Sequence, residues 1–512
     1  TFFLSCSGFT NQNNMSLHYC KLCSVLLLEH FGPIVQTVGE DLLKYDRKTL
    51  GAIRLGVNLP LNKVKEVLCV LIKYGFVAHH QTEKLNEYAI IPDRILMILR
   101  YPRYMFLIKS LLGDEQEIML EELLRRGFET ASQIIVKTYQ KLQQLSVERH
   151  QSVETLKEKF ESLVKNQFFL RCVSSENSGD PSDKADFNLP DLNLQALCQM
   201  VDGAAGDPGD NKVYWRVNFD RFTQDLRDQI MAAAITKRLD ENAGELMRQM
   251  LNLMYLRTAE WEATSNPIPY IEIKDAVRKL NYPLLIQYLD QYLCLIEEDS
   301  CQFLRRVGDS GGGQFSINMK EAFTQLAWTT LENIVLERFG SKAARIFRLV
   351  RTKKYVEQEQ IQQLAMIPAK EAKHLTYTLL QENYLHVQEL KKTTVSNAPT
   401  KTFFLFHIDL NQVVGMEINH CYHALYNTIQ RRDHENTVNK RMIEKHLRVQ
   451  TLTSNLKEHG ATEEQLNDIA EMMTPSEKLE LGKVQDIIKK LGASELQIDK
   501  TLFLLTMYLR YQ

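Results

Sequence analysis

Two stretches of the chain, residues 49–91 and 357–409, share one order of helices, turn and strands. In the first, the helical run TLGAIRLGV and the turn NLP precede LNKVKEVLCVLIKYGF, whose apolar residues recur at three- and four-residue steps. The strand-like runs VAHHQ and EYAII follow. In the second, QEQIQQLAM, the turn IP and AKEAKHLTYTLLQEN precede YLHVQEL and TFFLFHI. A helix–turn–helix followed by a β-hairpin predicts a winged helix.

The two stretches align without gaps from one proline onward. Pro60 corresponds to Pro368, and Gly75, just past the end of the second helix, corresponds to Asn383. Glycine and asparagine are the residues that most readily adopt the left-handed conformation that ends many helices. This agreement in periodicity and in turn chemistry indicates an internal repeat.

Two fainter copies of the pattern lie between these stretches. In one, amphipathic helices at 114–127 and 130–144 precede VETLKEKFESLVKNQ, which runs into FFLRC without a clear return strand. In the other, YIEIKDAVRKLN at 270–281 and PLLIQYLDQYLCLIEED at 283–299 precede the hairpin QFLRRV-GDSGGG-QFSIN. We therefore expect a mainly helical fold with small β-hairpins, built from four tandem extended winged-helix domains.

Two further segments differ in composition from these domains. Residues 173–211 are rich in Ser, Asp, Gly and Pro, which is typical of a flexible linker. From 412 to 512, apolar residues recur at alternating four- and three-residue steps on both sides of the helix-breaking MTPSE. This favours a C-terminal antiparallel coiled coil, although a helical subdomain without interlocking side chains fits nearly as well.

The expected organisation follows directly from these patterns. It is listed in chain order: a disordered or artefactual extension at 1–14, winged helices at 15–92 and 93–172, the linker at 173–211, winged helices at 212–320 and 321–411, and the coiled coil at 412–512.

Composition restricts the class of protein. The chain is 44% hydrophobic and 25% charged, as in ordinary globular proteins, and we expect neither a membrane-spanning helix nor a signal peptide. Its nine cysteines are scattered. Cys20 and Cys23 form a C-x-x-C inside an apolar helical run without a second pair, which favours buried thiols over a metal site and suits a reducing compartment.

The hexapeptide GDSGGG at 308–313 resembles the surroundings of the nucleophile in chymotrypsin-like proteases. A serine nucleophile needs a histidine base and an orienting carboxylate, and the nearest such context is VAHHQ at 77–81. The strand-like flanks of the hexapeptide instead predict a glycine-rich wing tip. A serine hydrolase using Ser310 is therefore a remote alternative. No nucleotide-binding loop or metalloprotease motif is present, so no catalytic residue, cofactor or metal is expected.

Charge gives a weak indication of nucleic-acid binding. The net charge is −2, whereas independent DNA-binding domains are usually basic. Ten cations on predicted second helices, on wings and in the basic run RTKK at 351–354 are candidates for contact with either phosphate or another subunit: Lys63, Lys65, Arg305, Arg306, Lys353, Lys354, Lys370, Lys373, Lys391 and Lys392. So few charges would give weak, salt-sensitive DNA binding by the chain alone.

Five passages resemble one known family in the expected order. They are LRYPRY (99–104), YWRVNFDRF (214–222), RRVGDSGGGQFSIN (305–318), ERFGSKAARIFRLV (337–350) and MIPAKEAK (366–373). The family is that of the third-largest subunit of eukaryotic RNA polymerase III, the biggest member of that polymerase's specific heterotrimer. Its architecture is four extended winged helices and a C-terminal coiled coil. The linker here is shorter and more acidic than in its vertebrate members.

The resemblance implies a non-catalytic, nuclear polymerase subunit, since catalysis belongs to the two largest subunits. Its implied partners are the other polymerase III subunits, including the clamp of the largest, the class III initiation factor and DNA. It implies roles in promoter recruitment and DNA opening for transfer-RNA and 5S ribosomal-RNA genes, and in sensing foreign DNA in the cytosol. An autonomous winged-helix DNA-binding regulator is the alternative function.

Overall fold

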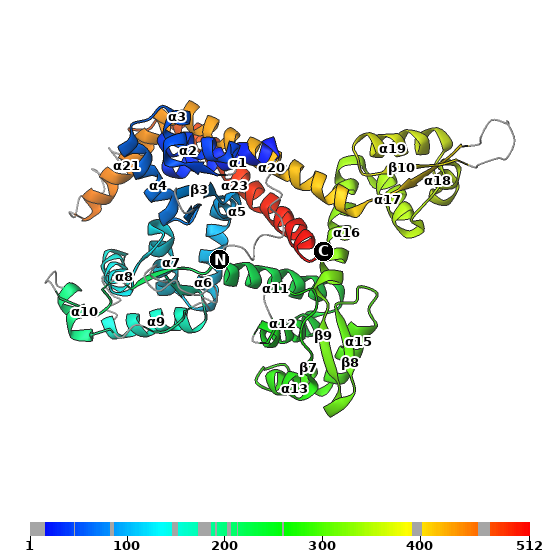
Figure 1. The fold of residues 1–512 in the computed structure, drawn as a ribbon, viewed down its shortest axis with the longest axis horizontal. Coiled ribbons are helices and arrows are strands. Elements are labelled where there is room, and N and C mark those ends of the chain that lie inside the picture. Colours follow the sequence, from blue (N-terminus) through cyan, green and yellow to red (C-terminus); the bar gives the residue numbers. More distant parts are fainter. Residues whose placement is uncertain are drawn as a thin grey trace. The chain divides into compact units, whose positions relative to one another are not determined.

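Over the residues that it describes, the computed structural model is mainly helical with four small antiparallel sheets (Figure 1). It forms two compact units, Thr1–Phe222 with Tyr422–Asp499, and Thr223–Cys421 with Lys500–Gln512. The expected extension at 1–14 lies outside the described residues. These are 16–45, 47–81, 86–145, 152–172, 186–189, 192–201, 206–211, 213–255, 257–258, 261–391, 402–458 and 472–512.

Three of the four sheets share one strand order, and the fourth is a two-stranded version of it. In three of them a short first strand pairs with the third strand, which pairs with the second. They consist of β1 (Lys48–Thr49), β3 (Asn86–Ile90) and β2 (Val77–Gln81); β4 (Glu129–Thr130), β6 (Tyr214–Val217) and β5 (Phe169–Arg171); and β7 (Ile268–Pro269), β9 (Gln314–Ile317) and β8 (Leu304–Gly308). In the fourth, β10 (His386–Lys391) pairs with β11 (Thr402–His407), and Val356 bridges to Phe406 in place of the first strand.

Each sheet is combined with the helices of a winged helix. The three helical positions of each domain are occupied by α2 (Pro33–Lys44), α3 (Leu50–Val57) and α4 (Leu61–Lys73); α7 (Asp114–Arg126), α8 (Ala131–Leu145) and α9 (Val153–Lys165); α12 (Glu241–Tyr255), α13 (Tyr270–Arg278) and the pair α14 (Pro283–Gln287) and α15 (Leu289–Glu298); and α17 (Ser341–Lys353), α18 (Gln358–Ala365) and α19 (Ala369–Gln381). A further helix precedes each set: α1 (Leu17–Phe31), α6 (Tyr101–Leu111), α11 (Phe219–Arg238) and α16 (Met319–Phe339). Between the first two domains lie α5 (Pro92–Leu96) and the 3-10 helix η2 (Met97–Arg100). The expected four tandem extended winged helices are confirmed.

A left-handed residue precedes the wing in all four domains. These residues are Gly75, Gln167, Gln302 and Asn383, with φ of 72°, 64°, 50° and 59°, and only in the third domain does the residue lie four positions beyond the end of the helix, since α15 ends at Glu298. A buried aromatic residue follows in each case: Phe76, Phe168, Phe303 and Tyr384. The N–H of Phe76 donates to the carbonyl of Leu71 at 2.9 Å, five residues earlier, as in the Schellman motif. The predicted Gly75–Asn383 correspondence is therefore one half of a fourfold repeat.

The second domain differs from the expectation in its return strand. β6 completes its sheet, with Phe169 opposite Val217, and Trp215 is buried against Phe160 with ring centroids 5.5 Å apart. The second domain thus continues past the expected border at 212. Its wing is interrupted by a long insertion, which is tolerated because loop-closure entropy grows only slowly with length.

The stretch expected to be a flexible linker, 173–211, contains a helix that packs on the second domain. Helix α10 (Leu194–Val201) packs on α8 and α9, and Leu197 is fully buried. Asp210 is also buried and accepts hydrogen bonds from the N–H of Ser132 at 2.8 Å and from its hydroxyl at 3.0 Å. This part of the stretch therefore belongs to the second domain, because the apolar side chains of its short helix pack against the core of that domain.

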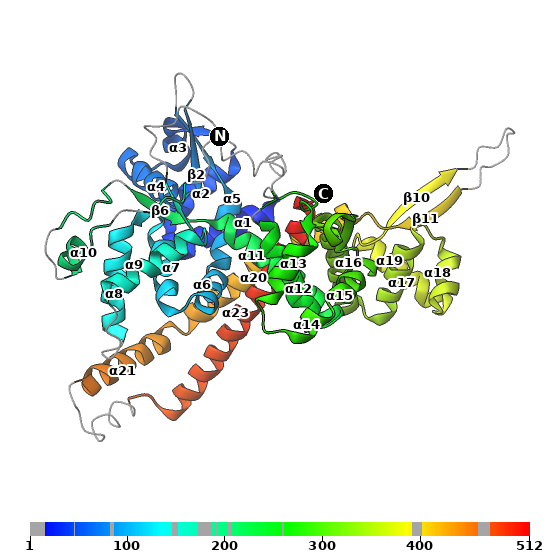
Figure 2. The ribbon, with the colours of Figure 1, turned by 90° about the horizontal axis from the view of Figure 1, so that it is seen from below.

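The described residues of the C-terminal part form three long helices: α20 (Leu410–Val438), α21 (Lys440–Glu458) and α23 (Pro475–Arg510) (Figure 2). Lys445 of α21 pairs with Glu477 at 2.8 Å, and Arg432 of α20 pairs with Glu495, so that α23 runs antiparallel to the other two. On α23 the predicted apolar seam is buried at Val484, whereas Leu452 of α21 is exposed. The C-terminal helices agree with the expected antiparallel arrangement, and the predicted apolar residues are more deeply buried on α23 than on α21.

A buried charge cluster fixes α23 within its unit. Asp499 is only 1% exposed and lies 3.1 Å from both Arg100 Nε and Arg103 Nη1. Opposite charges buried at this distance satisfy each other where water is absent. The cluster joins the LRYPRY passage to the C-terminal helix.

Candidate interaction surfaces

Helix α4 of the first domain presents two of the predicted cations to solvent. Its apolar face, which includes Val64 and Leu71, is buried in the domain, so Lys63 and Lys65 lie on the opposite, exposed face. Lys63 Nζ lies 2.7 Å from Glu66 Oε2 in an ion pair that is exposed on both sides. Such pairs contribute little stability, so Lys63 can exchange its partner for a phosphate or a carboxylate at small cost.

Helix α19 presents Lys370 and Lys373 in the equivalent place of the fourth domain. Both side chains are exposed, and Lys373 Nζ lies 5.9 Å from the centre of the Tyr377 ring. The acid between them, Glu371, is engaged by Lys342 of α17 at 2.6 Å. This neighbour neutralises the acid and leaves the exposed face of α19 positive.

The third wing carries Arg305 and Arg306 on β8. Their ladder partners are Ser316 and Phe315, so the two side chains point to opposite faces of the sheet, and both are exposed. Arg306 Nη2 forms an ion pair with Asp309 Oδ1 at 3.0 Å. Each face of the wing therefore receives one arginine.

The hexapeptide forms the tip of this wing, as the sequence predicted. Ser310–Gly312 make a single 3-10 turn, and Gly311, Gly312 and Gly313 have φ of 65°, 91° and 117°, values that side chains rarely allow. Ser310 Oγ accepts a hydrogen bond from Gln314 Nε2 at 3.2 Å, and Asp309 is held by Arg306. These are the contacts of a turn, and they provide no histidine–carboxylate pair for the serine.

The remaining predicted cations lie elsewhere. Lys353 and Lys354 are exposed at the end of α17, where Lys354 adopts φ of 66°. Lys391 ends β10, but its side chain and the whole of Lys392 lie outside the described residues. The predicted cations that the structure describes therefore lie on several different elements, namely α4, β8, the end of α17 and α19.

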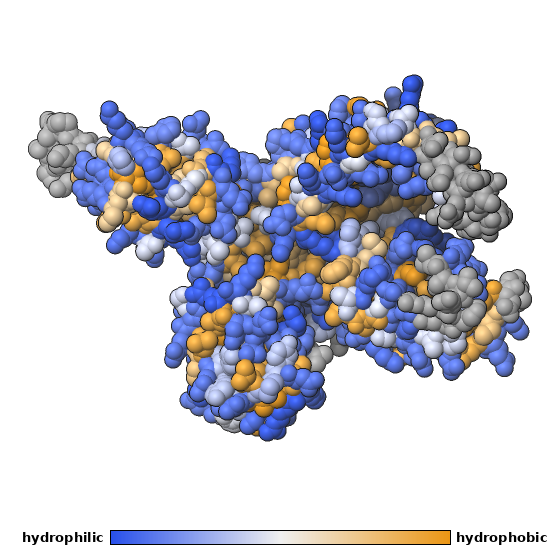
Figure 3. All heavy atoms as spheres, turned by 180° about the vertical axis from the view of Figure 1, so that it is seen from behind, coloured by the Kyte–Doolittle hydropathy of each residue, from blue (hydrophilic) through white to orange (hydrophobic). Residues whose placement is uncertain are grey.

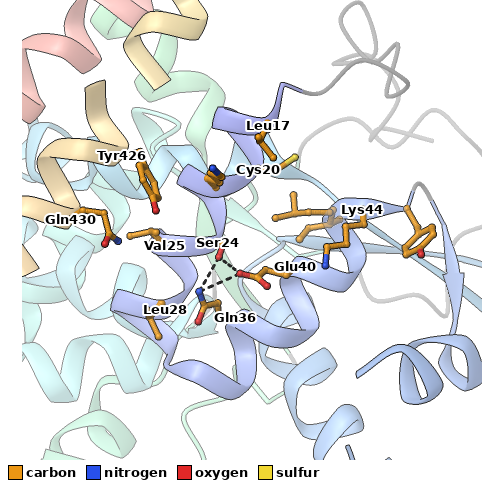
Figure 4. A pocket seen from close by; sticks show the side chains of 14 residues that line it. Leu17, Cys20, Ser24, Val25, Leu28, Gln36, Glu40, Lys44, Tyr426 and Gln430 are labelled. Atoms are coloured by element: carbon orange, nitrogen blue, oxygen red, sulfur yellow. Dashed lines mark hydrogen bonds between the residues drawn. The ribbon is translucent and has the colours of Figure 1, made fainter. Parts of the chain in front are cut away.

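An open groove lies along the outer side of α1, a feature that the sequence reasoning missed (Figure 4). It has a volume of about 740 Å³ and is lined by α1, α2 and the side chains of Tyr426 and Gln430. Its polar floor is a network in which Ser24 donates to Glu40 at 2.6 Å and Gln36 donates to Ser24 at 2.9 Å. The sequence contains one sign of this groove: apolar residues lie on all sides of α1, although only one side of the helix is buried.

The C-x-x-C of α1 contributes to the core of the first domain. Cys23 is fully buried, its Sγ lies 3.9 Å from the carbonyl of Pro92, and burial raises the pKa of its thiol well above the usual value. Among the described residues, no group of three or more His, Cys, Asp or Glu side chains could hold a metal ion. In the same part of the chain, no helix is long and apolar enough to cross a membrane.

Four winged helices in tandem, followed by long antiparallel helices, define a multi-domain winged-helix protein. Models of polymerase III subunit families match most of the chain. They are the RNA polymerase III subunit RPC82 helix-turn-helix domain (21–82), RNA polymerase III subunit RPC82 (136–326), the POLR3C C-terminal winged-helix domain (331–408) and the helical hairpin domain of DNA-directed RNA polymerase III subunit RPC3 (441–504).

Whole-chain comparison agrees with these matches. The chain is 36% identical to DNA-directed RNA polymerase III subunit RPC3 of Rattus norvegicus and 37% identical to that of Mus musculus, with 96% of this chain and 98% of each relative covered. The subunit of Danio rerio is 36% identical, with 97% and 99% covered. The chain therefore belongs to the RPC3 family of RNA polymerase III subunits, and the suspected resemblance is confirmed.

Proposed function

We propose that this chain is a non-catalytic subunit that helps RNA polymerase III reach the promoter-bound class III initiation factor and open the DNA. The observation that carries the proposal is family membership along nearly the whole chain. By the family resemblance, the genes served are those for small RNAs such as transfer RNA and 5S ribosomal RNA. The partners are the other polymerase III subunits, the clamp of the largest among them, and the initiation factor.

The distribution of charge supports a DNA contact made only within the complex. Among the predicted cations, α4 exposes the pair Lys63 and Lys65 on one domain, and α19 exposes the pair Lys370 and Lys373 on another. Two lysines release too few counterions from DNA for tight binding by one domain. Partner subunits that hold the domains beside the cleft would add these contacts together. The net charge of −2 weighs against an autonomous regulator.

We propose the nucleus as the working location of this subunit. The proposed cytosolic role in sensing foreign DNA would use the same contacts with the DNA backbone. Contacts to phosphate carry no sequence information, so they would serve promoter DNA and foreign DNA alike.

The test compares polymerase III lacking this chain with the same enzyme after the chain is added back. On promoter DNA carrying the initiation factor, we expect recruitment and permanganate-reactive open DNA only when the chain is present. Replacing Lys63, Lys65, Lys370 and Lys373 by Ala should reduce opening. The control Lys440→Ala should not, because Lys440 lies on α21, outside the winged helices, where it is 4.0 Å from Glu444 of the same helix. Recruitment and opening without the chain would refute the proposal.

A further inference from the structure

The third domain lacks the positive charge that the first and fourth expose at the same place. Its α14–α15 pair stands where α4 and α19 stand, as the last helical segment before the wing. α4 carries three lysines and one glutamate, and α19 carries two lysines and one glutamate. From Leu280 to Leu304 there is no lysine or arginine at all, and the charged residues are four acids: Asp290, Glu297, Glu298 and Asp299.

Large apolar side chains take the place of the missing cations. Leu284 is 56% exposed and Leu295 is 49% exposed, and three further large residues of this segment are also exposed: Tyr282, Ile286 and Tyr288. The domain core already uses a separate set from the same helices, which includes the fully buried Leu285. The helix is interrupted at Tyr288, which has φ of −112° and separates α14 from α15. As a result, these two helices carry apolar residues on exposed sides as well as on the buried side.

The surface around these helices agrees with this reading. The part of the molecule that carries α13–α15 in Figure 1 shows apolar patches among hydrophilic residues in Figure 3. One acid is already engaged within the domain, because Asp299 accepts from Arg238 Nη2 at 2.6 Å. Asp290 and Glu298 are exposed on the same segment as the apolar residues. A DNA backbone brought to this face would meet the exposed acids of the segment, and the segment itself offers no lysine or arginine to bind a phosphate.

We infer that the α14–α15 face of the third domain is a docking surface for protein and not for DNA. Its partner is a polypeptide segment with aliphatic or aromatic anchors flanked by Lys or Arg. Exposed aliphatic and aromatic side chains are suited to the core of an interface, and the acids give complementarity to a cationic rim. The inference rests on the proposed function, because a polymerase subunit or initiation factor would supply the segment.

The test places a photo-crosslinking amino acid at Leu284 or at Leu295 of the full chain, assembled into purified polymerase III on factor-bound promoter DNA. We expect crosslinks from both positions to a polypeptide of the assembly, at a segment that contains Lys or Arg, and none to DNA. Leu284→Glu should lower the crosslink yield from position 295 by roughly tenfold, as the loss of a central interface residue does. The control is Leu55→Glu on α3, since Leu55 is 81% exposed.

Each other outcome contradicts a defined claim. Crosslinks to DNA, crosslinks to a segment without cations, or no crosslink in a polymerase that retains the chain would overturn the docking surface alone. Failure of the unsubstituted chain to assemble with polymerase subunits would overturn the proposed function and this inference with it. An equal loss of yield with Leu55→Glu would show a general structural effect and would also refute the specific role of Leu284.

Discussion

At the scale of single residues, Asp499 offers the sharpest test of the packing. It is buried and faces both Arg100 and Arg103, and burial of Arg100 is tolerated because this carboxylate is beside it. Asp499→Ala would leave Arg100 buried without its main counter-charge. We expect the free energy of unfolding of this unit to fall by about 3–5 kcal/mol, measured by urea denaturation with a probe in the unit.

The control for this substitution lies on the same helix. Asp486 is exposed on α23, so Asp486→Ala should change the unfolding free energy by less than about 0.5 kcal/mol. If both substitutions destabilise the unit equally, the buried cluster does not have the role assigned to it.

At the left-handed residues before each wing, we expect a substitution that increases stability. Gln167 and Gln302 have φ of 64° and 50°. In this left-handed region a residue with a Cβ is destabilised by about 1–2 kcal/mol through steric crowding, which glycine avoids because it has no Cβ. Gln167→Gly should therefore raise thermal stability, as followed by calorimetry, by the equivalent of about 1 kcal/mol.

A glutamine in an ordinary helical position provides the comparison. Gln291 lies inside α15, where glycine is expected to lower stability by about 1 kcal/mol. A loss of stability in both variants would mean that the backbone at Gln167 is not held in the left-handed region.

At the scale of elements, the fourth wing should respond to pH. His386 and His407 are paired across β10 and β11, with ring centroids 5.8 Å apart, and Asp409 lies near them. Burial lowers the pKa of His386, and the ring of His407 lowers it further. In the unfolded chain the pKa of a histidine is about 6.5, so His386 binds a proton more readily in the unfolded chain than in the folded domain.

Stability of the fourth domain should therefore fall as pH drops below about 6.5 and stop falling below the folded pKa of His386. Amide hydrogen exchange of β10 and β11 between pH 7.5 and 5.5, corrected for intrinsic rates, measures this change. His386→Gln should flatten the profile, whereas a profile unchanged by the substitution would assign the pH effect to other groups.

Much of the element pattern could be predicted from the sequence, because local chemistry determines it. Pro60 and Pro368 each precede a helix, and Gly75 and Asn383 each end one, as their backbone preferences require. β6 could not be found in this way, since its pairing with β5 depends on contacts across a long insertion.

The candidate surfaces were predictable to a smaller extent. Residue type and helical period place Lys65 and Lys373 on exposed faces, and the Lys63–Glu66 pair follows from its three-residue spacing. The pairing of Lys342 with Glu371 joins two helices that only the folded domain brings together. The exposed apolar face at Leu284 could not be predicted, because apolar residues at helical spacing indicate a buried side of a helix equally well.

At the scale of the whole molecule, charge predicts how the isolated chain behaves toward DNA. With a net charge of −2 and its exposed lysine pairs on different helices, the free chain should bind duplex DNA weakly. Fluorescence anisotropy with a labelled duplex, repeated over a range of salt concentrations, measures this. Tight binding with a steep salt slope would favour the autonomous regulator.

The central claim is that the chain works as part of RNA polymerase III, and co-purification tests it most directly. A tagged chain, expressed at its natural level and recovered at low and moderate salt, should bring down the other polymerase III subunits in constant proportion, as measured by quantitative mass spectrometry. Recovery of the free chain alone at low salt, with no polymerase subunit, would contradict the claim.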